Sequence, residues 1–554
     1  RRPGTAGRPG EENAVANLPR GGAALAGALA VTLTLGACGG PDGAEGAAIT
    51  IYGIEPQNPL VPGDTPEVGG GKIVNVLWSG LVDYPPGGGA PRNLLAESIE
   101  SPDARVYTIR IRPDTTFHDG SPVTANSFVE AWNWVAYGPH GAANSAFLSE
   151  IAGYGAVHPQ DPDGVGPRKA PLPAVRTMSG LKVVDRHTFT VTLAAPSAIW
   201  PTKLGHMAFS PMPPSFFTST PDEWGRKPVG NGPVRLVSWT PESEIRLTRY
   251  ADYALRDRSA VADVTVKIYQ QDTTAYADLL AGNLDFMEQV PVSTLAGGAW
   301  ERDLGDRRIT IDLPATHMIS FPLYDPRFAD PRLRRAVSYA IDRRMIVDKL
   351  FSGLRKPADS FSNPTARGYV AGECTACRFD LARAQGEFKR AGGFTGEMIF
   401  YYNADSSHKE WVEAVVGQVR ENLGVAARAE AVPTFAALRT MVGNRAMKGP
   451  HRAGWRADYP DVEIWLGPLY TTGGAGNDGG YRNPKVDALY AAGVRSTDLA
   501  TAHARFAEAG KLVDADLPAV PVFYASQQSG YSPQIEHASV TAVGELDLAT
   551  VRLR

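Results

Sequence analysis

The chain has 554 residues, of which 43% are hydrophobic and 21% charged, and its formal net charge at pH 7 is −4. This length exceeds what one hydrophobic core usually serves, so two or three domains are expected. There is no excess of basic residues that would attract phosphate groups, which argues against nucleic acid as a partner.

The N-terminal segment has the pattern of an export signal. Four arginines lie among its first 20 residues, and residues 23–37 are apolar or small apart from two threonines. This run is shorter than the roughly 20 residues that span a membrane. It ends in Leu35-Gly36-Ala37-Cys38, which resembles a bacterial lipobox, where cleavage precedes a cysteine that receives diacylglycerol. We therefore expect a signal peptide over 1–37, a lipid anchor on Cys38 and a flexible tether over 38–48. A plain secretion signal with a chance cysteine is the alternative.

The body of the chain mixes two hydrophobic periodicities. Three segments alternate apolar and polar residues, as strands with one buried face do: 107–111, 189–193 and 264–268. A helix is predicted to begin after Asp330, which can cap it, and to continue to Gly353. A second helix is predicted over 409–423, ending at Gly424. The irregular alternation of the two patterns indicates a mixed α/β fold.

Two cysteines remain in the body of the chain. Cys374 and Cys377 form a Cys-x-x-Cys pair, which could be a redox motif or half of a zinc site. No second cysteine pair and no suitably spaced histidine pair accompanies them, which argues against zinc. Because the chain is expected to be exported, we predict a local disulfide between them. No metal or other cofactor is expected.

Seven short blocks carry recognisable patterns: residues 55–60, 78–82, 117–125, 228–233, 279–285, 332–343 and 454–460. In the same order, they resemble blocks of the extracellular solute-binding proteins of peptide, dipeptide and nickel ABC importers (family 5). The most specific is Phe-His-Asp-Gly-Ser-Pro-Val-Thr-Ala at 117–125, and Gly-Trp-Arg-Ala-Asp-Tyr-Pro at 454–460 resembles the ligand-site segment of oligopeptide-binding members. Asn231 departs from the family pattern, in which threonine is more usual.

The resemblance implies a two-lobed periplasmic-binding-protein-like α/β fold with an additional third domain and a hinge between the lobes. Lobe I would comprise residues 49–78, 190–312 and 516–554, the additional domain II residues 79–189, and lobe III residues 313–515. The ligand would bind in the cleft between the lobes. This interleaving agrees with the lack of a clean linker in the middle of the chain.

The resemblance also implies a residue for the amino end of a peptide. In oligopeptide-binding members the aspartate of Gly-Trp-x-Ala-Asp-Tyr binds the α-ammonium group, and that residue here is Asp458. A closed cleft excludes water, so each charged end of a peptide needs a fixed partner. The alternative is that Asp458 caps a turn before Pro460. Trp455 could form the wall of a side-chain pocket or belong to the core.

Four further positions follow from the resemblance. Arg452 and Arg439 stand where some oligopeptide-binding members carry arginines for the peptide carboxylate, although Arg439 aligns only with a small insertion. A guanidinium group matches a carboxylate in two hydrogen bonds, but a solvated surface position is the alternative, and the stronger one for Arg439. Glu67 and Val68 fall where the family pairs a strand with the peptide backbone, while Pro66 lacks an N–H for one such bond.

The resemblance predicts a binding protein without catalysis, on the extracytoplasmic face of a bacterial cell membrane. It would be a monomer, anchored through Cys38, that captures oligopeptides and delivers them to the permease of an ABC importer. The alternatives are a same-fold binder of a nickel chelate, an oligosaccharide or a glycopeptide, and a regulatory lipoprotein without a transport role. A secreted hydrolase using Ser179 and Lys182 would be a different class, but the partner motifs of such enzymes are absent from the sequence.

Overall fold

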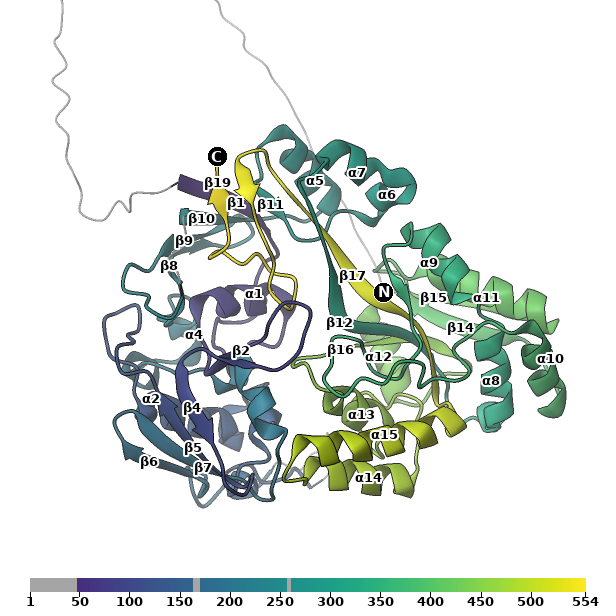
Figure 1. Ribbon diagram of the computed structural model, residues 1–554, viewed down its shortest axis with the longest axis horizontal. Coiled ribbons are helices and arrows are strands. Elements are labelled where there is room, and N and C mark those ends of the chain that lie inside the picture. Colours follow the sequence, from purple (N-terminus) through teal and green to yellow (C-terminus); the bar gives the residue numbers. More distant parts are fainter. Residues whose placement is uncertain (1–46, 163–169, 257–260) are drawn as a thin grey trace, which may run out of the picture. The chain divides into compact units, whose positions relative to one another are not determined.

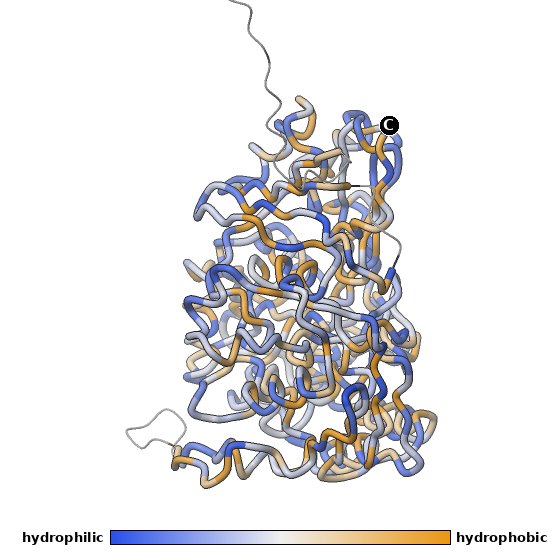
Figure 2. Tube along the Cα trace, turned by 90° about the vertical axis from the view of Figure 1, so that its left-hand side faces the viewer, coloured by the Kyte–Doolittle hydropathy of each residue, from blue (hydrophilic) through white to orange (hydrophobic). Residues whose placement is uncertain are grey.

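The computed structural model describes residues 47–162, 170–256 and 261–554, so the predicted signal peptide and Cys38 lie outside the described residues. Helices and strands are mixed along the chain, and the predicted mixed α/β class is confirmed. In these residues, no helix combines the length and apolar character needed to cross a bilayer. Figure 2 shows hydrophobic and hydrophilic stretches alternating closely along the trace.

The secondary structure elements are labelled in Figure 1. The strands are β1 (Ala47–Gly53), β2 (Val82–Asp83), β3 (Arg92–Asn93), β4 (Ala96–Glu100), β5 (Val106–Ile111), β6 (Leu181–Asp185), β7 (Thr188–Thr192), β8 (Val234–Thr240), β9 (Glu244–Arg249), β10 (Val261–Ile268), β11 (Phe286–Met287), β12 (Arg308–Ser320), β13 (Lys356–Pro357), β14 (Met398–Asn403), β15 (Ala427–Val432), β16 (His451–Arg456), β17 (Ala519–Tyr531), β18 (Ile535–His537) and β19 (Arg552–Leu553). The α-helices are α1 (Val68–Leu77), α2 (Ala125–Ala136), α3 (Tyr154–Val157), α4 (Pro221–Trp224), α5 (Asp272–Ala281), α6 (Val292–Leu295), α7 (Ala299–Leu304), α8 (Pro331–Tyr339), α9 (Arg343–Phe351), α10 (Leu381–Arg390), α11 (Lys409–Leu423), α12 (Phe435–Gly443), α13 (Glu463–Tyr470), α14 (Pro484–Val494) and α15 (Leu499–Asp516). The short 3-10 helices are η1 (Gly138–His140), η2 (Ser145–Leu148), η3 (Trp200–Gly205), η4 (Met207–Phe209), η5 (Pro214–Thr218), η6 (Ala296–Gly298) and η7 (Pro326–Phe328).

One large sheet connects most of the described chain. Its strands follow the order β15-β14-β16-β12-β17-β11-β1-β10-β9-β8, with β13 also paired to β17. The long strands β12 and β17 are antiparallel neighbours, visible side by side in Figure 1. Their pairing is interrupted between Asp312 and Thr316, where Pro314 has no N–H to donate. On one side of the break β17 also pairs with β11, and on the other side β12 also pairs with β16. The two long strands therefore connect two parts of the sheet.

A separate antiparallel sheet, β4-β5-β7-β6, packs against α2. The rings of Phe128 and Phe189 stack there with centroids 5.5 Å apart, and Trp132 meets Phe189 edge-on at 5.6 Å. Strands β5, β7 and β10 fall on the segments that were predicted from alternating residues, and these three predictions are confirmed.

The buried apolar side chains form two main cores. The first core includes Trp132 and Phe286 and joins the four-stranded sheet to β1 and β10. The second core includes Trp411 and Trp465 and fills the space around β14, α8, α11 and α13. Strand β16 packs against the second core, and η3 packs into the first.

The segment after Asp330 is two helices rather than one. Asp330 caps α8 as predicted, because its carboxylate accepts a hydrogen bond from the N–H of Arg332. The helix ends at Tyr339, and α9 begins at Arg343. Asp342 caps this new start by accepting from the N–H of Met345, so the single helix predicted to reach Gly353 is wrong. The other predicted helix, α11, spans 409–423 and ends at Gly424 in the left-handed conformation, as expected.

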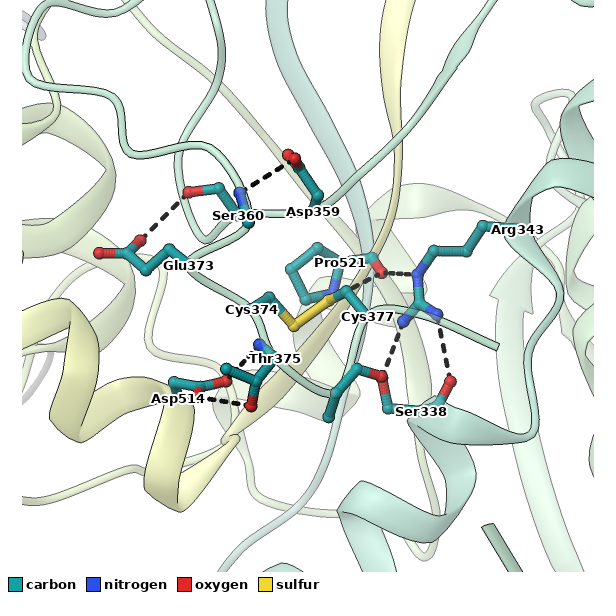
Figure 3. Close-up of a disulfide and its surroundings, with 12 residues drawn as sticks. Ser338, Arg343, Asp359, Ser360, Glu373, Cys374, Thr375, Cys377, Asp514 and Pro521 are labelled. Carbon is teal, nitrogen blue, oxygen red and sulfur yellow. Dashed lines mark hydrogen bonds between the residues drawn. A yellow bond between two sulfur atoms is a disulfide. The ribbon is translucent and has the colours of Figure 1, made fainter. Parts of the chain in front are cut away.

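Cys374 and Cys377 form a disulfide in the loop between β13 and α10 (Figure 3). The backbone N–H and the hydroxyl of Thr375, between them, each donate to the carboxylate of Asp514 on α15 at 2.8 Å. The disulfide loop is thereby held against α15.

Candidate ligand site

Asp458 lies two residues beyond the end of β16, beside the break in β12. The N–H of the preceding Ala457 donates to the carbonyl of Pro314 at 2.8 Å, so the break positions this segment. Arg456 donates to the carbonyl of Val543 at 2.7 Å. The side chain of Asp458 is exposed, and within the described residues no group donates a hydrogen bond to its carboxylate. This leaves the carboxylate open to a ligand, whereas a carboxylate that caps a turn would accept a hydrogen bond from a backbone N–H.

The surroundings of Asp458 have a low polarity for a solvent-accessible carboxylate. Burial of the group raises its pKa to about 6, although the positive charge of Arg456 lowers it. The residue is exposed, but enough protein lies near its carboxylate to desolvate that group in part. Burial also raises the pKa of Tyr84, and the charge of Asp458 adds to that effect. The loop that follows β2 therefore lies close to Asp458.

The raised pKa of Asp458 predicts that the affinity for a free-amine peptide depends on pH. An ammonium group pairs with the ionised carboxylate, so affinity should be constant well above pH 6. Below pH 6 it should fall, approaching about tenfold per pH unit as the carboxylate takes up a proton. Calorimetric titration between pH 5 and 8 measures this.

The matched control for the pH dependence is the N-acetylated form of the same peptide. Burial raises the pKa of Glu373 and of Glu545 to about 7, so these groups can add their own pH dependence. The acetylated peptide reports that contribution, because it has no ammonium group. Identical pH profiles for the two peptides would contradict a role for Asp458.

Trp455 lies on β16, opposite Thr316 of β12, and is half-buried. Its ring packs against Gly476, where an added Cβ would come within 2.8 Å of Cζ3. Its indole nitrogen has no hydrogen-bond partner among the described residues. These contacts make Trp455 part of the packing around the glycine-rich loop at 473–480, and its role in a ligand pocket stays a prediction.

Arg452 also lies on β16, and its guanidinium group is only partly used by the fold. Nε donates to Asn403 at 2.5 Å, and Cζ lies 4.8 Å from the centroid of the exposed Phe435 ring. In the described chain, the two terminal nitrogens of Arg452 have no hydrogen-bond partner. Burial lowers the pKa of Arg452 to about 10, so the group remains charged at neutral pH. Arg452 can therefore bind an anion through the N–H groups of its two free terminal nitrogens.

Two histidines lie close to Arg452 and were missed by the sequence analysis. Burial lowers the pKa of His408 to about 4, and Arg452 lowers it further, so its ring is neutral. The ring of His317 lies 5.9 Å from that of His408, and burial together with Arg355 lowers its pKa as well. These residues come from β12 and from the start of α11, and no sequence motif connects them to Arg452.

Arg439 on α12 is neutralised within the protein. Its Nη1 donates to Asp478 at 2.7 Å, and the same carboxylate lies 3.8 Å from Nε2 of the buried His451. Burial raises the pKa of Asp478, but the interactions with the nearby His451 and with Arg439 outweigh that effect and lower it. This pairing favours a structural position for Arg439 over a contact with a ligand carboxylate.

Glu67 is the N-cap of α1. Its Oε2 accepts from the N–H of Gly70 at 2.6 Å, and its Oε1 accepts from the N–H groups of Gln57 and Asn58 at 3.0 and 3.2 Å. Val68 is the first helical residue and is 56% exposed. The segment is a helix start rather than a strand here, so pairing with a peptide backbone at this place stays a prediction.

The residues that a hydrolase or a metal-binding protein would need do not form a site in the described chain. Ser179 lies in the turn before β6 and Lys182 on β6 itself with an exposed side chain, and no hydrogen bond joins the two in the described chain. Among the described residues, no group of three or more His, Cys, Asp or Glu side chains could hold a metal ion.

Comparison with known proteins gives matches over most of the chain. The model of bacterial extracellular solute-binding proteins, family 5 (Middle), matches residues 90–477. The periplasmic oligopeptide-binding protein OppA of Salmonella typhimurium is 27% identical over 446 residues, 79% of this chain and 79% of that protein. The probable deoxycholate-binding periplasmic protein YgiS of Escherichia coli is 27% identical over 472 residues, 82% of this chain and 83% of that protein. The crystal structure of Haemophilus influenzae OppA in complex with the peptide RPPGFSPFR has a TM-score of 0.71 at 21% identity, covering 92% of this chain and 99% of that one.

The structural likeness shows the two-lobed fold that the resemblance implied. At the level of the family, the activity is the binding of a solute outside the cytoplasm rather than catalysis. The match spans most of the described residues, including β16 with Trp455 and the adjoining Asp458. The chain belongs to the bacterial extracellular solute-binding proteins of family 5.

Proposed function

We propose that this protein captures short peptides with a free amino end and delivers them to the permease of an ABC importer. The observation that carries the proposal is the state of Asp458: an accessible carboxylate without an internal donor, held between the break in β12 and the loop around Tyr84. An α-ammonium group would supply the missing partner, and such charge-assisted bonds contribute about 1.5–3 kcal/mol.

Arg452 supports the same proposal at the other end of the peptide, where it would bind the carboxylate. Asp458 follows Arg452 by six residues, and an extended chain rises about 3.3 Å per residue, so the backbone between them spans at most about 20 Å. An extended peptide of about five or six residues has the same length. The guanidinium group on β16 and the carboxylate just beyond its end are thus suited to the charged ends of a short peptide.

The break in β12 supports the proposed closure around the ligand. Lobe III (313–515), as predicted from the resemblance, begins at this break, next to Pro314. A strand that loses its pairing over a few residues can change its backbone angles there, as hinge segments do. We infer that lobe III moves against the remainder of the chain at residues 312–316.

A second candidate ligand is an apolar molecule with a carboxylate. The free donors of Arg452 lie beside Phe435, which is 48% exposed, and this pair suits an anion attached to an apolar body. Such a ligand would not need Asp458. The relative described as a probable deoxycholate-binding protein makes deoxycholate a suitable probe.

Thermal unfolding of the full chain with three probes separates these candidates. The probes are a tri- to pentapeptide mixture with free amino ends, the same mixture N-acetylated, and deoxycholate. A ligand at 100 times its dissociation constant stabilises the protein by about 2.7 kcal/mol. We expect stabilisation by the free-amine mixture at much lower concentrations than by the acetylated mixture. Stabilisation by deoxycholate alone would favour the second candidate, and equal effects of the two peptide mixtures would overturn the first.

We further propose that Cys38 carries the lipid anchor and that the protein works as a monomer on the extracytoplasmic face of the cell membrane. The lipobox-like sequence and the glycine-rich tether support this proposal. Cys38→Ala should release the protein from the membrane fraction, and retention of that variant in the membrane would contradict the anchor.

A further inference from the structure

A buried ion network connects the two cores. Lys203 lies on η3, next to the first core, and its Nζ is 2.5 Å from Glu150 and 3.4 Å from Glu463. Glu463 begins α13 in the second core. Lys203 is 8% exposed and Glu463 4%. The Lys203–Glu463 pair is therefore buried and joins the two cores, while the side chain of Glu150 is 23% exposed at the edge of the network.

Lys203 and Glu463 are both charged at neutral pH. Burial lowers the pKa of Lys203, but the carboxylates of Glu463 and Glu150 outweigh it, and the pKa is raised overall. Burial raises the pKa of Glu463, but Lys203 and hydrogen bonds from Tyr459 and Tyr490 outweigh it, and that pKa is lowered. The charge on each residue thus depends on the presence of the other.

Tyr459 connects this network to the ligand site. The ammonium group of Lys203 lies 5.4 Å from the centroid of the Tyr459 ring, and the Tyr459 hydroxyl donates to Glu463. Tyr459 is 4% exposed and directly follows Asp458 in the chain. Tyr459 and Glu463 thus hold each other within the second core, and Lys203 contacts both of them from the side of the first core.

A second contact fixes the same segment. The N–H of Arg367 donates to the carbonyl of Pro460 at 2.9 Å, and Arg367 Nη1 donates to the hydroxyl of Thr202, the neighbour of Lys203, at 3.4 Å. Asp458 itself makes no hydrogen bond within the described residues. Its orientation therefore comes from Ala457 before it and from Tyr459 and Pro460 after it.

The cost of burying these charges indicates a purpose other than stability. Taking ions out of water costs several kcal/mol each, and apolar replacements are often as stable as a buried ion pair. Buried polar networks are best attested as devices that select one arrangement of the parts they join. This network can form only while η3 and α13 are in contact.

We propose that Lys203 is a positioning residue for the ligand ammonium group, acting through Glu463 and Tyr459 on Asp458. The inference rests on the proposed capture of free-amine peptides. Contact between the two cores then fixes the carboxylate in its binding orientation, and separation of η3 from α13 releases that orientation together with the ligand.

The test compares the affinities of the full chain for a random tetrapeptide mixture with free amino ends and for the same mixture N-acetylated. Tyr459→Phe removes only the hydroxyl that joins the network. Lys203→Met combined with Glu150→Gln removes one charge of each sign, which avoids an unpaired Glu150. We expect the ratio of the two affinities to fall at least fivefold in both variants, while the affinity for the acetylated mixture changes less than twofold.

Two further variants complete the test. Lys203→Arg should keep the ratio within twofold, because it restores the positive charge. Lys267→Met, which removes an ion pair with Asp278 at the molecular surface, should leave the ratio unchanged. If Lys203→Met with Glu150→Gln does not fold, Tyr459→Phe alone decides. If the folded variants lose affinity for the free-amine and the acetylated mixtures equally, the ratio of the two affinities stays unchanged, and the inference would be overturned. A wild-type protein without preference for free amino ends would overturn the proposed function as well.

Discussion

Replacing Asp458 with asparagine should weaken the binding of a free-amine peptide by about 10- to 150-fold. The change keeps the size of the side chain but removes a charge-assisted bond of about 1.5–3 kcal/mol, and each 1.4 kcal/mol corresponds to a factor of ten. Because no group in the described chain donates to this carboxylate, the fold should tolerate the change. Calorimetric titration of wild type and variant measures the difference directly.

Two controls make the Asp458 result specific. The N-acetylated peptide should bind wild type and Asp458→Asn with similar affinities, since it has no ammonium group. Glu413→Gln, which neutralises an exposed carboxylate on α11, should bind both peptides as wild type does. Equal loss of affinity for both peptides in Asp458→Asn would show that the residue supports the site without contacting the amino end.

Replacing Arg343 with methionine should lower the free energy of unfolding by about 3–5 kcal/mol. Arg343 is 3% exposed, and burial lowers the pKa of its guanidinium group to about 9. Figure 3 shows it beside the disulfide, with Nε donating to the carbonyl of Pro521 at 2.7 Å and Nη2 to the hydroxyl of Ser338 at 2.8 Å. Nη1 donates to the carbonyls of Ser338 and Ile341 at 3.1 and 3.2 Å. Methionine would leave these buried acceptors without donors.

Urea denaturation at neutral pH measures the loss at Arg343. The neighbouring Arg344, whose side chain is 76% exposed, provides the matched control, and Arg344→Met should change the unfolding free energy by less than about 0.5 kcal/mol. Arg343→Lys should recover only part of the stability, because an ammonium group cannot reproduce the planar arrangement of five donors. A loss below 1 kcal/mol in Arg343→Met would mean that water or a rearranged chain satisfies these acceptors.

Features that depend on neighbouring residues in the chain could be predicted from the sequence. The alternation in β5, the cap at Asp330 and the glycine that ends α11 are all local signals. Asp458 could be put forward as a binding residue because it lies within a motif that resembles the family's, and that role stays a prediction. The division of the helix at residues 340–342 was not predicted, since the apolar face of α8 continues through Ile341 and hides the second cap at Asp342.

Features that depend on distant partners could not be predicted. Nothing around Glu67 indicates a helix cap, because glutamate is not among the residues preferred at that position. The sequence favoured a solvated surface position for Arg439, and nothing in it indicated that the loop at 473–480 places Asp478 against that side chain. The network of Lys203, Glu150 and Glu463 joins three segments that are far apart in the chain, and no motif marks any of them.

The most direct test of peptide capture is a crystal structure of the full chain with a free-amine peptide bound. We expect the α-amino nitrogen to lie about 2.7–2.9 Å from a carboxylate oxygen of Asp458, with the peptide running along β16 toward Arg452. A bound peptide whose amino end lies elsewhere, leaving Asp458 in contact with solvent alone, would contradict this arrangement.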